Sequence, residues 1–171
     1  MVGGGIVGLC CAWWLRAAGA SVVLFDPSPG TGYSLGAGRM FRHAHRAPEH
    51  ARLAARASLL WDEMTNRLSQ VDRPLLARIG ALHTMPCRDA LAPLEGSLQE
   101  TEHDYELLPP GSVAGRWPEL AIDPPAALFD PHGGRIEAAA AIRALRDDLE
   151  EQIALARVDG LRAGGPGPDV Q

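Results

Sequence analysis

Near its N-terminus the chain reads Gly3-Gly4-Gly5-Ile6-Val7-Gly8, which fits the pattern G-x-G-x-x-G of a dinucleotide-binding turn. An apolar run follows and ends at Gly19, where a residue that tolerates positive φ suits a helix C-terminus. The β-branched and aromatic run Ser21–Phe25 then predicts a strand, and Asp26 closes it. Turn, helix, strand and acidic residue therefore stand in the order of a βαβ nucleotide-binding unit.

The residues of this turn have separate expected roles. Gly3 permits the tight turn, Gly5 lets a pyrophosphate approach the backbone, and Gly8 allows helix and strand to touch. Ile6 and Val7 complete the predicted cofactor-binding set. The helix N-terminus around them supplies free N–H groups and a partial positive charge for the phosphates.

Asp26 is the predicted ribose-binding residue, since a carboxylate offers hydrogen-bond acceptors to the ribose hydroxyls. FAD and NAD both suit this pattern, and a glycine-rich turn without a ligand is the third interpretation. Only Met1 and Val2 precede Gly3, so the first parallel strand is expected to be nearly absent. We therefore expect an α/β fold with an incomplete Rossmann-like domain, encoded by a truncated reading frame.

Composition narrows the class of protein. The 171 residues have the length of one domain and a globular composition, with 46% hydrophobic and 22% charged residues. A net charge of −5 argues against a nucleic acid or an anionic membrane as partner. The chain contains no lysine, which excludes a Schiff-base lysine and a Walker-type phosphate lysine. Cys10, Cys11 and Cys87 offer no paired framework, which favours a reducing, cytoplasmic location.

Beyond Asp26 the sequence predicts a loop and then a long helix. Pro27–Gly38 is rich in glycine, serine and proline, as loops are. Pro48 suits the first turn of a helix. The apolar face of that helix is expected to consist of Leu53, Ala57, Leu60, Met64 and Leu68.

After Pro74 short strands alternate with proline-containing turns, as in a small α+β lobe. The expected strands are residues 81–85, 105–108 and 126–129, with a helix near 89–102. Gly133–Ile136 then leads into a last helix, from Glu137 to about Gln152. Its inward face is expected to be Ile142, Leu145, Leu149 and Ile153, and the acidic run Asp147–Glu151 is expected to be a solvated face.

Two further segments carry a family resemblance. They are Gly36-x-x-Arg39-x-x-Arg42-His43-Ala44 and Leu53-Ala-Ala-Arg-Ala-Ser-Leu-Leu-Trp61. With the glycine turn and Asp26, they resemble the D-amino-acid oxidase superfamily of FAD enzymes, most closely the branch of monomeric sarcosine oxidase and N-methyltryptophan oxidase. The resemblance continues to about Gln152 through Gly80-Ala-Leu82, Arg116-Trp-Pro118 and Asp130-Pro-His-Gly-Gly134.

The resemblance implies a cofactor and two catalytic arginines. FAD would be the cofactor, with Gly36 and Arg39 added to the residues that bind it. Arg39 would lie near the flavin ring, and Arg42 would bind the substrate carboxylate. A guanidinium suits this role because it is always charged and can bind a carboxylate through two hydrogen bonds. The alternative is that both arginines are solvated loop residues.

The resemblance also implies a reaction. An amino acid or N-methyl amino acid would be oxidised at its C–N bond, as in sarcosine oxidases, giving an imine and hydrogen peroxide. Molecular oxygen or another electron acceptor would be the second substrate. Sarcosine, another N-methyl amino acid, a cyclic imino acid and a glycated amino acid all remain open, as do oxidase and dehydrogenase behaviour.

Relatives in this family are longer, and their flavin-linking cysteine and flavin-side lysine lie beyond the matched region. A complementing subunit is therefore one expected partner. Two alternatives remain open, a non-catalytic nucleotide-binding fragment and an NAD-dependent dehydrogenase. His43, His45 and His50 lie close in sequence, but we expect no metal site because no carboxylate or cysteine stands at ligand spacing.

The predicted domains follow from these assignments. Residues 1–46 and 131–163 would form a discontinuous FAD-binding domain of Rossmann-like fold. Residues 47–130 would form the connecting helix and part of the substrate-binding lobe, and residues 164–171 a disordered tail.

Overall fold

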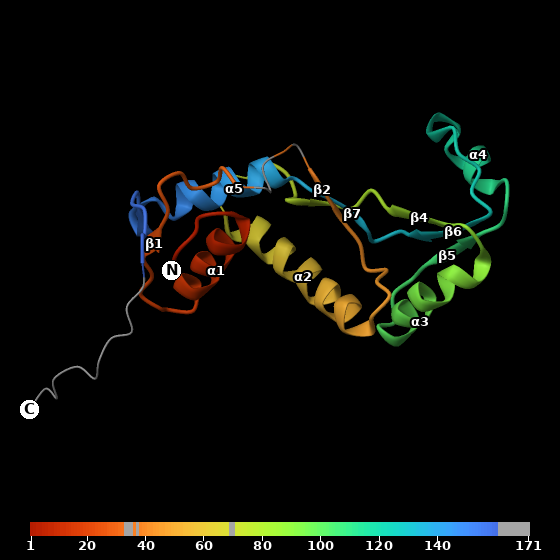
Figure 1. Ribbon diagram of the computed structural model, residues 1–171, viewed down its shortest axis with the longest axis horizontal. Helices are drawn as coiled ribbons and strands as arrows, with labels where there is room; N and C mark the ends of the chain where they lie inside the picture. Colours follow the sequence, from red (N-terminus) through yellow and green to blue (C-terminus); the bar gives the residue numbers. More distant parts are fainter. Residues whose placement is uncertain (33–35, 37, 69–70, 161–171) are drawn as a thin grey trace, which may run out of the picture. The chain divides into compact units, whose positions relative to one another are not determined.

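The computed structural model describes residues 1–32, 36, 38–68 and 71–160. It has the mixed α/β fold that the sequence predicts, with the elements labelled in Figure 1. Two compact units make up the chain, Met1–Leu35 with Ile142–Gln171, and Gly36–Ala141. The domain boundaries proposed from the sequence stay a prediction, and the tail 164–171 lies outside the described residues.

The first unit contains a small parallel sheet. Strand β1 (Leu24–Phe25) pairs in parallel with β8 (Ile153–Ala154), and Val2 forms an isolated parallel bridge to Phe25. The amide of Phe25 donates to Met1 O, and the amide of Gly3 donates to Phe25 O, both at 2.9 Å. The residues before the glycine turn thus make a short strand-like pairing beside β1.

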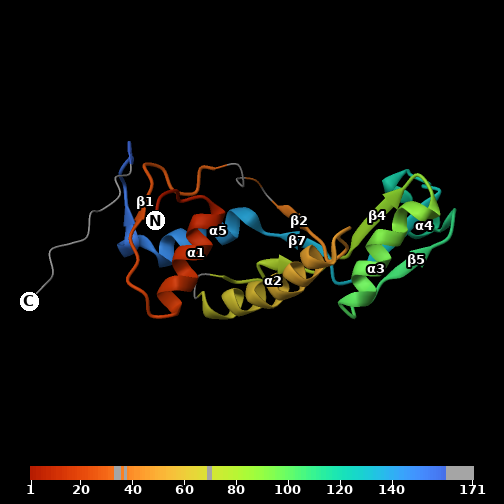
Figure 2. The same cartoon turned by 60° about the horizontal axis from the view of Figure 1, so that its bottom comes forward.

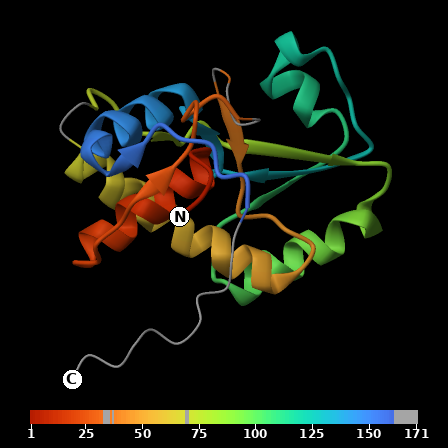
Figure 3. The same cartoon turned by 60° about the vertical axis from the view of Figure 1, so that its left-hand side comes forward.

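Helix α1 (Ile6–Ala17) lies beside the C-terminal part of α5 (Ala138–Asp148), as the red and blue helices of Figure 3 show. Asp148 joins them. Its carboxylate accepts a 2.9 Å hydrogen bond from Nε1 of Trp13 and pairs with the guanidinium of Arg16, which also donates to the main-chain oxygen of Asp148 at 2.5 Å. Asp148 is therefore not part of a solvated face, whereas Leu149 points inward as predicted and is fully buried.

The predicted last helix is shorter than expected. Helix α5 ends at Asp148 and is followed by the 3-10 turn η3 (Glu150–Gln152), so Ile153 lies in β8 and not on a helix face. Ile142 and Leu145 are buried, as expected. None of the helices in the described ranges has the length and apolar character needed to cross a lipid bilayer.

The second unit holds two antiparallel sheets. The first has the order β2-β7-β3, and the second the order β4-β6-β5. Strand β7 was not predicted, because Gly133 before it and Gly134 at its start resemble a turn that precedes a helix. The strands are β2 (Arg39–Phe41), β3 (Leu76–Ala77), β4 (Ala81–Met85), β5 (Glu106–Leu108), β6 (Ala126–Asp130) and β7 (Gly134–Ile136).

Short helices pack on the two faces of the β4-β6-β5 sheet, as Figures 1 and 2 show. Alternate residues of β6 explain this arrangement, since Ala126 and Leu128 face one side and Ala127 the other. Ala126 and Leu128 pack in one apolar cluster with Leu91, Leu94 and Leu98, and Ala127 packs in another with Val113. The helices are η1 (Arg88–Leu91) and α3 (Ala92–Glu100) in the first cluster, and α4 (Ser112–Arg116) with η2 (Pro118–Leu120) on the other side.

Helix α2 (Pro48–Arg67) begins at Pro48 as predicted, and Met64 and Leu68 of the expected apolar face are buried. Ala51 and Ala54 are buried, whereas the side chain of Leu53 is 67% exposed. Ala54 packs against Phe41 and Leu76, where a small side chain allows the helix to come close to the strands. Leu53 was therefore wrongly placed on the buried face, and close packing at alanine contributes to the orientation of this part of the helix.

We predict that Asp148→Ala lowers the free energy of unfolding by about 1–3 kcal/mol, because it removes the acceptor shared by Trp13 and Arg16. Urea unfolding monitored by tryptophan fluorescence measures this loss. The matched control is Asp147→Ala, since Asp147 is exposed and pairs with its neighbour Arg146, and it should cost less than about 0.5 kcal/mol. Equal losses in the two variants would contradict the anchoring role of Asp148.

Candidate functional site

The glycine turn is built by close backbone contacts. Gly3 has φ +99°, a conformation that favours glycine. A Cβ atom added at Gly8 would lie 1.9 Å from the carbonyl oxygen of Gly3 and 3.7 Å from Cδ1 of Leu24. Gly8 thus lets α1 begin directly against the turn and against β1, as the sequence pattern predicts.

Gly5 differs from Gly8 because nothing surrounds its missing side chain. It is the N-cap of α1, has extended backbone angles, and makes no side-chain capping hydrogen bond. A Cβ atom added there would meet no heavy atom within 4 Å. The N-terminus of α1 therefore opens onto free space, which suits an anionic phosphate group. Within this helix end Ile6 is half-buried and Val7 is 73% exposed.

Asp26 lies against the same turn. Its Oδ2 accepts a 2.5 Å hydrogen bond from the amide of Gly4, and its Oδ1 accepts one of 2.7 Å from the amide of Ser28. A Cβ atom at Gly4 would come within 2.9 Å of Pro29 and 3.1 Å of Asp26 Cβ, so glycine is required for this approach. The structure thus brings Asp26 and the glycine turn together, with the carboxylate held in one orientation.

Gly36, Arg39 and Arg42 belong to the second unit. Gly36 has φ +152°, and a Cβ atom there would lie 2.8 Å from Nη1 of Arg39. The guanidinium of Arg39 therefore lies over Gly36, and it also donates a 3.1 Å hydrogen bond to Gly38 O. The arginine is exposed at the start of β2.

Arg42 follows β2 directly and is exposed. Within the described part of the chain, no carboxylate lies at ion-pair distance from its guanidinium. Its charge instead acts on two histidines: the pKa of His83 and that of His45 are lowered, first by burial and then by the positive charge of Arg42. The positive charge of Arg42 therefore lies close enough to both imidazoles to disfavour their protonated forms.

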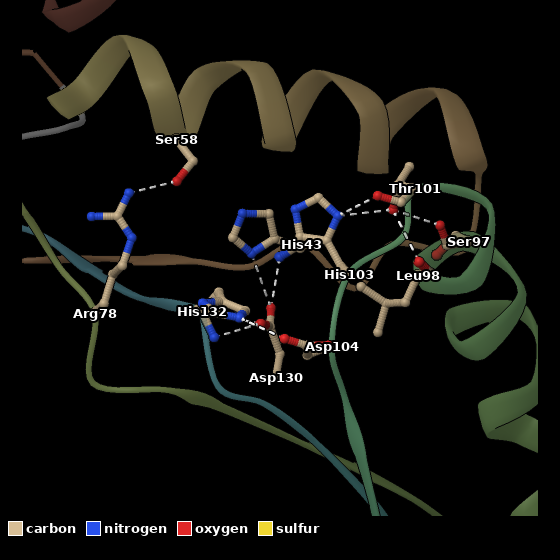
Figure 4. Close-up of polar contacts among 11 residues, drawn as sticks. His43, Ser58, Arg78, Ser97, Leu98, Thr101, His103, Asp104, Asp130 and His132 are labelled. Carbon is tan, nitrogen blue, oxygen red and sulfur yellow. Dashed lines mark hydrogen bonds and ion pairs between the residues drawn. The ribbon is translucent and has the colours of Figure 1, made fainter. Parts of the chain in front are cut away.

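A buried carboxylate, that of Asp130, lies beside His43, the residue that follows Arg42. Asp130 is fully buried, and its Oδ2 accepts a 2.8 Å hydrogen bond from the amide of His43 and lies 3.4 Å from Nδ1 of the same residue (Figure 4). Its Oδ1 accepts from the amides of His132 and Gly133, at 3.0 and 2.9 Å. The ring of His43 stacks on that of His103, with the ring centroids 4.4 Å apart.

Burial alone would raise the pKa of Asp130, but the hydrogen bonds and charge of His43 and the amide of Gly133 outweigh it and lower the pKa to about 2. The carboxylate is therefore ionised at neutral pH. Sequence reasoning assigned no role to Asp130. The sequence feature that could have indicated its role is the run Asp130-Pro-His-Gly-Gly134, because this composition is typical of a turn closed by an aspartate side chain.

No group of three or more histidine, cysteine or acidic side chains within residues 1–32, 36, 38–68 and 71–160 is arranged to hold a metal ion. All three cysteines are free, and Cys11 and Cys87 are exposed. Burial, with a smaller contribution from Cys11, raises the pKa of Cys10 to about 12.

A comparison with known protein families identifies the family of this chain. The family described as FAD dependent oxidoreductase (DAO) matches residues 1–169. The chain belongs to this family. The predicted superfamily and α/β fold class are thereby confirmed, and FAD is the family's cofactor, which decides between the two dinucleotides that the glycine turn left open. No curated protein matches the chain in sequence.

Several solved structures with the same fold are described as oxidases or dehydrogenases of amino acids, and this chain spans about two fifths of their length. NikD, described as an unusual amino acid oxidase essential for nikkomycin biosynthesis, is 22% identical with a TM-score of 0.68, over 90% of this chain and 41% of NikD. Glycine oxidase from Geobacillus kaustophilus is 18% identical with a TM-score of 0.72, over 90% and 44% of the two chains. L-proline dehydrogenase from P. horikoshii is 19% identical with a TM-score of 0.70, over 88% and 41%.

We predict that Asp130→Asn lowers the free energy of unfolding at pH 7 by about 1–3 kcal/mol, since charge-assisted hydrogen bonds are lost. A carboxyl group whose pKa is lower in the folded protein stabilises it above the unfolded pKa, and this contribution disappears as pH falls through the folded pKa. The difference between wild type and variant should therefore narrow between the ordinary value of 3.8 and about 2.

Urea unfolding over a series of pH values measures this difference. Asp104→Asn is the matched control, because the side chain of Asp104 is 86% exposed and contacts the same turn through His132; it should cost less than about 0.5 kcal/mol. A stability difference for Asp130→Asn that did not change with pH would contradict the ionised state of this carboxylate.

Proposed function

We propose that the chain is an FAD-dependent oxidoreductase that oxidises the C–N bond of an amino acid or N-methyl amino acid, as sarcosine oxidases do. The products would be an imine and hydrogen peroxide. The observation that carries the proposal is the glycine turn, where the uncapped N-terminus of α1 opens onto free space at Gly5 and Asp26 is fixed beside it. This arrangement fits the pyrophosphate and ribose of a dinucleotide.

The residues that would hold FAD follow from this geometry and from the family pattern. Gly3, Gly5 and Gly8 would shape the pyrophosphate site, and the N-terminal residues Ile6 and Val7 would present the helix end to it. Asp26 would bind the ribose. When bound, FAD supplies the two-electron acceptor for the reaction.

The second unit would supply the groups that act at the reacting end. Gly36 and Arg39 would belong to the FAD site, with the guanidinium of Arg39 tuning the charge near the flavin ring. Arg42 would bind the substrate carboxylate and so orient the C–N bond. Two observations support this role for Arg42: it is exposed, and it has no carboxylate partner in the described residues.

Further partners follow from the same proposal. Molecular oxygen or another electron acceptor would take the electrons, and a subunit that complements this chain remains part of the proposal. We place the protein in the cytoplasm because its free cysteines suit a reducing compartment. The descriptions of NikD as an amino acid oxidase and of glycine oxidase support an amino acid as the substrate class.

The first test is the affinity for FAD of a variant that fills the open space. Gly5→Ala should fold, because its Cβ atom meets no neighbour within 4 Å, yet it should weaken FAD binding by about tenfold or more, since the methyl group takes the place of the pyrophosphate. Quenching of FAD fluorescence during titration with purified protein measures the dissociation constant.

The matched control is Gly96→Ala, a substitution on α3 whose Cβ atom also meets nothing within 4 Å. It should leave the FAD dissociation constant unchanged within about twofold. Unchanged FAD affinity in Gly5→Ala would refute the pyrophosphate site. FAD binding without turnover of any amino acid would instead favour the non-catalytic fragment.

The second test concerns Arg42. With N-methylglycine as substrate, Arg42→Ala should raise KM by about tenfold or more, because a bidentate charged contact is lost. Arg42→Lys should recover only part of this loss, since an ammonium group cannot reproduce the guanidinium fork. Peroxide release measured at varied substrate concentration gives KM; an unchanged KM in Arg42→Ala would remove Arg42 from the substrate site.

A further inference from the structure

We propose that Asp130 is a positioning residue for Arg42, because its buried carboxylate fixes the main chain immediately after that arginine. This inference rests on the proposed function, in which Arg42 binds the substrate carboxylate. It concerns a fully buried residue that would determine where a substrate-binding side chain lies.

The side chain of Arg42 is directed by the backbone around it. Along this segment exposure alternates: Met40 is 68% exposed and Phe41 is buried, then Arg42 is exposed and His43 is buried. The buried side chains of Phe41, at the end of β2, and of His43 thus flank Arg42, whose side chain is left on the open side. Any loss of register here would redirect the guanidinium.

The segment is held on both sides of Arg42. Before it, Phe41 is the last residue of β2 in register with β7, opposite Gly134. After it, the amide of His43 donates to Asp130 Oδ2 at 2.8 Å (Figure 4). The carboxylate thus continues the attachment of the strand at the point where the ladder of β2 and β7 ends.

Asp130 is itself rigidly placed. It ends β6, where it is in register with Ala81 of β4. Its second oxygen accepts the amides of His132 and Gly133, which closes the turn toward β7. A Cβ atom at Gly133 would lie 3.0 Å from Oδ2 of Asp130 and 2.6 Å from Cβ of Ala81, so this approach needs glycine.

The carboxylate of Asp130 does not neutralise the positive charge of Arg42. No ion pair joins Asp130 to Arg42 among the described residues, since the oxygen nearest this segment accepts the His43 amide and faces the His43 ring. Asp130 therefore positions Arg42 through the main chain of His43, and it does not compete with a substrate carboxylate for the guanidinium.

The test measures the binding of a carboxylate and of its neutral analogue. The FAD-supplemented chain is labelled with 15N-arginine, and the Nε–H signal of Arg42 is identified by its absence in Arg42→Lys. Titration with N-methylglycine and with N-methylglycinamide gives two dissociation constants. Asp130→Asn should raise that of N-methylglycine about tenfold and leave that of the amide within about twofold.

Two controls separate positioning from a general structural role. Asp104→Asn removes a charge next to the same turn, where the carboxylate is 86% exposed, and should change neither constant by more than about twofold. In an Arg42→Ala background, where the Arg42 signal is absent and binding is followed by isothermal titration calorimetry, Asp130→Asn should have no further effect on the affinity for N-methylglycine, because Asp130 acts through Arg42. An undiminished effect in that background, or an equal loss for both ligands, would overturn the proposal.

Hydrogen exchange of the wild-type chain tests the positioning without any variant and without substrate. The amide of His43 should exchange as slowly as the amides within β6, because it donates to a buried carboxylate. Exchange as fast as in an exposed loop would overturn the positioning alone. If N-methylglycine instead bound wild type and Arg42→Ala equally, the substrate role of Arg42 would fail, and with it the part of this inference that concerns the substrate.

Discussion

The contact between Gly8 and the carbonyl oxygen of Gly3 is the constraint on which the first unit depends. A Cβ atom at position 8 would lie only 1.9 Å from this carbonyl oxygen, so no residue other than glycine fits there while the turn keeps its form. That contact places Met1–Gly3 beside β1 and starts α1 at the end of the turn. The direction of α1 then brings Trp13 and Arg16 to Asp148, so the helix is fixed at both ends.

The second unit depends on the same kind of constraint. A Cβ atom at Gly134 would lie 2.0 Å from the carbonyl oxygen of Ala77, so β3 can pair with β7 only because that side chain is missing. Gly133, its neighbour, admits the carboxylate of Asp130. In both units, therefore, glycine is needed where two stretches of backbone meet, and polar side chains then fasten the neighbouring segments.

The sequence predicted those features that neighbouring residues determine. The glycine turn, the start of α2 at Pro48, and strands β4 and β6 follow from local patterns of glycine, proline and apolar residues. It missed contacts between distant positions. His43 and Asp130 lie 87 positions apart. Neither residue alone indicates that the buried carboxylate of Asp130 accepts a hydrogen bond from the amide of His43. Asp148 was taken for a solvated residue for the same reason, since its partners lie on α1.

The orientation of α2 shows where pattern reasoning is weakest. Apolar spacing favoured Leu53 as a core residue, but Ala54 packs against the strands and Leu53 is exposed. The glycine turn was predicted more fully than the arginine segment, because the geometry of the turn depends on the six residues Gly3–Gly8 and on the neighbouring strand β1. The roles proposed for Gly36, Arg39 and Arg42 do not follow from a local pattern, and the family resemblance is what singled out these residues.

The partly buried thiol of Cys10 has a consequence for durability. Hydrogen peroxide oxidises thiolates much faster than thiols, and with a pKa of about 12 Cys10 remains protonated throughout the physiological range. If peroxide is released in the proposed reaction, it would thus spare Cys10 on α1, while the exposed Cys11 and Cys87 would meet the oxidant first. Oxidative ageing of such a protein would begin at its surface and leave the packing of α1 beneath Cys10 intact.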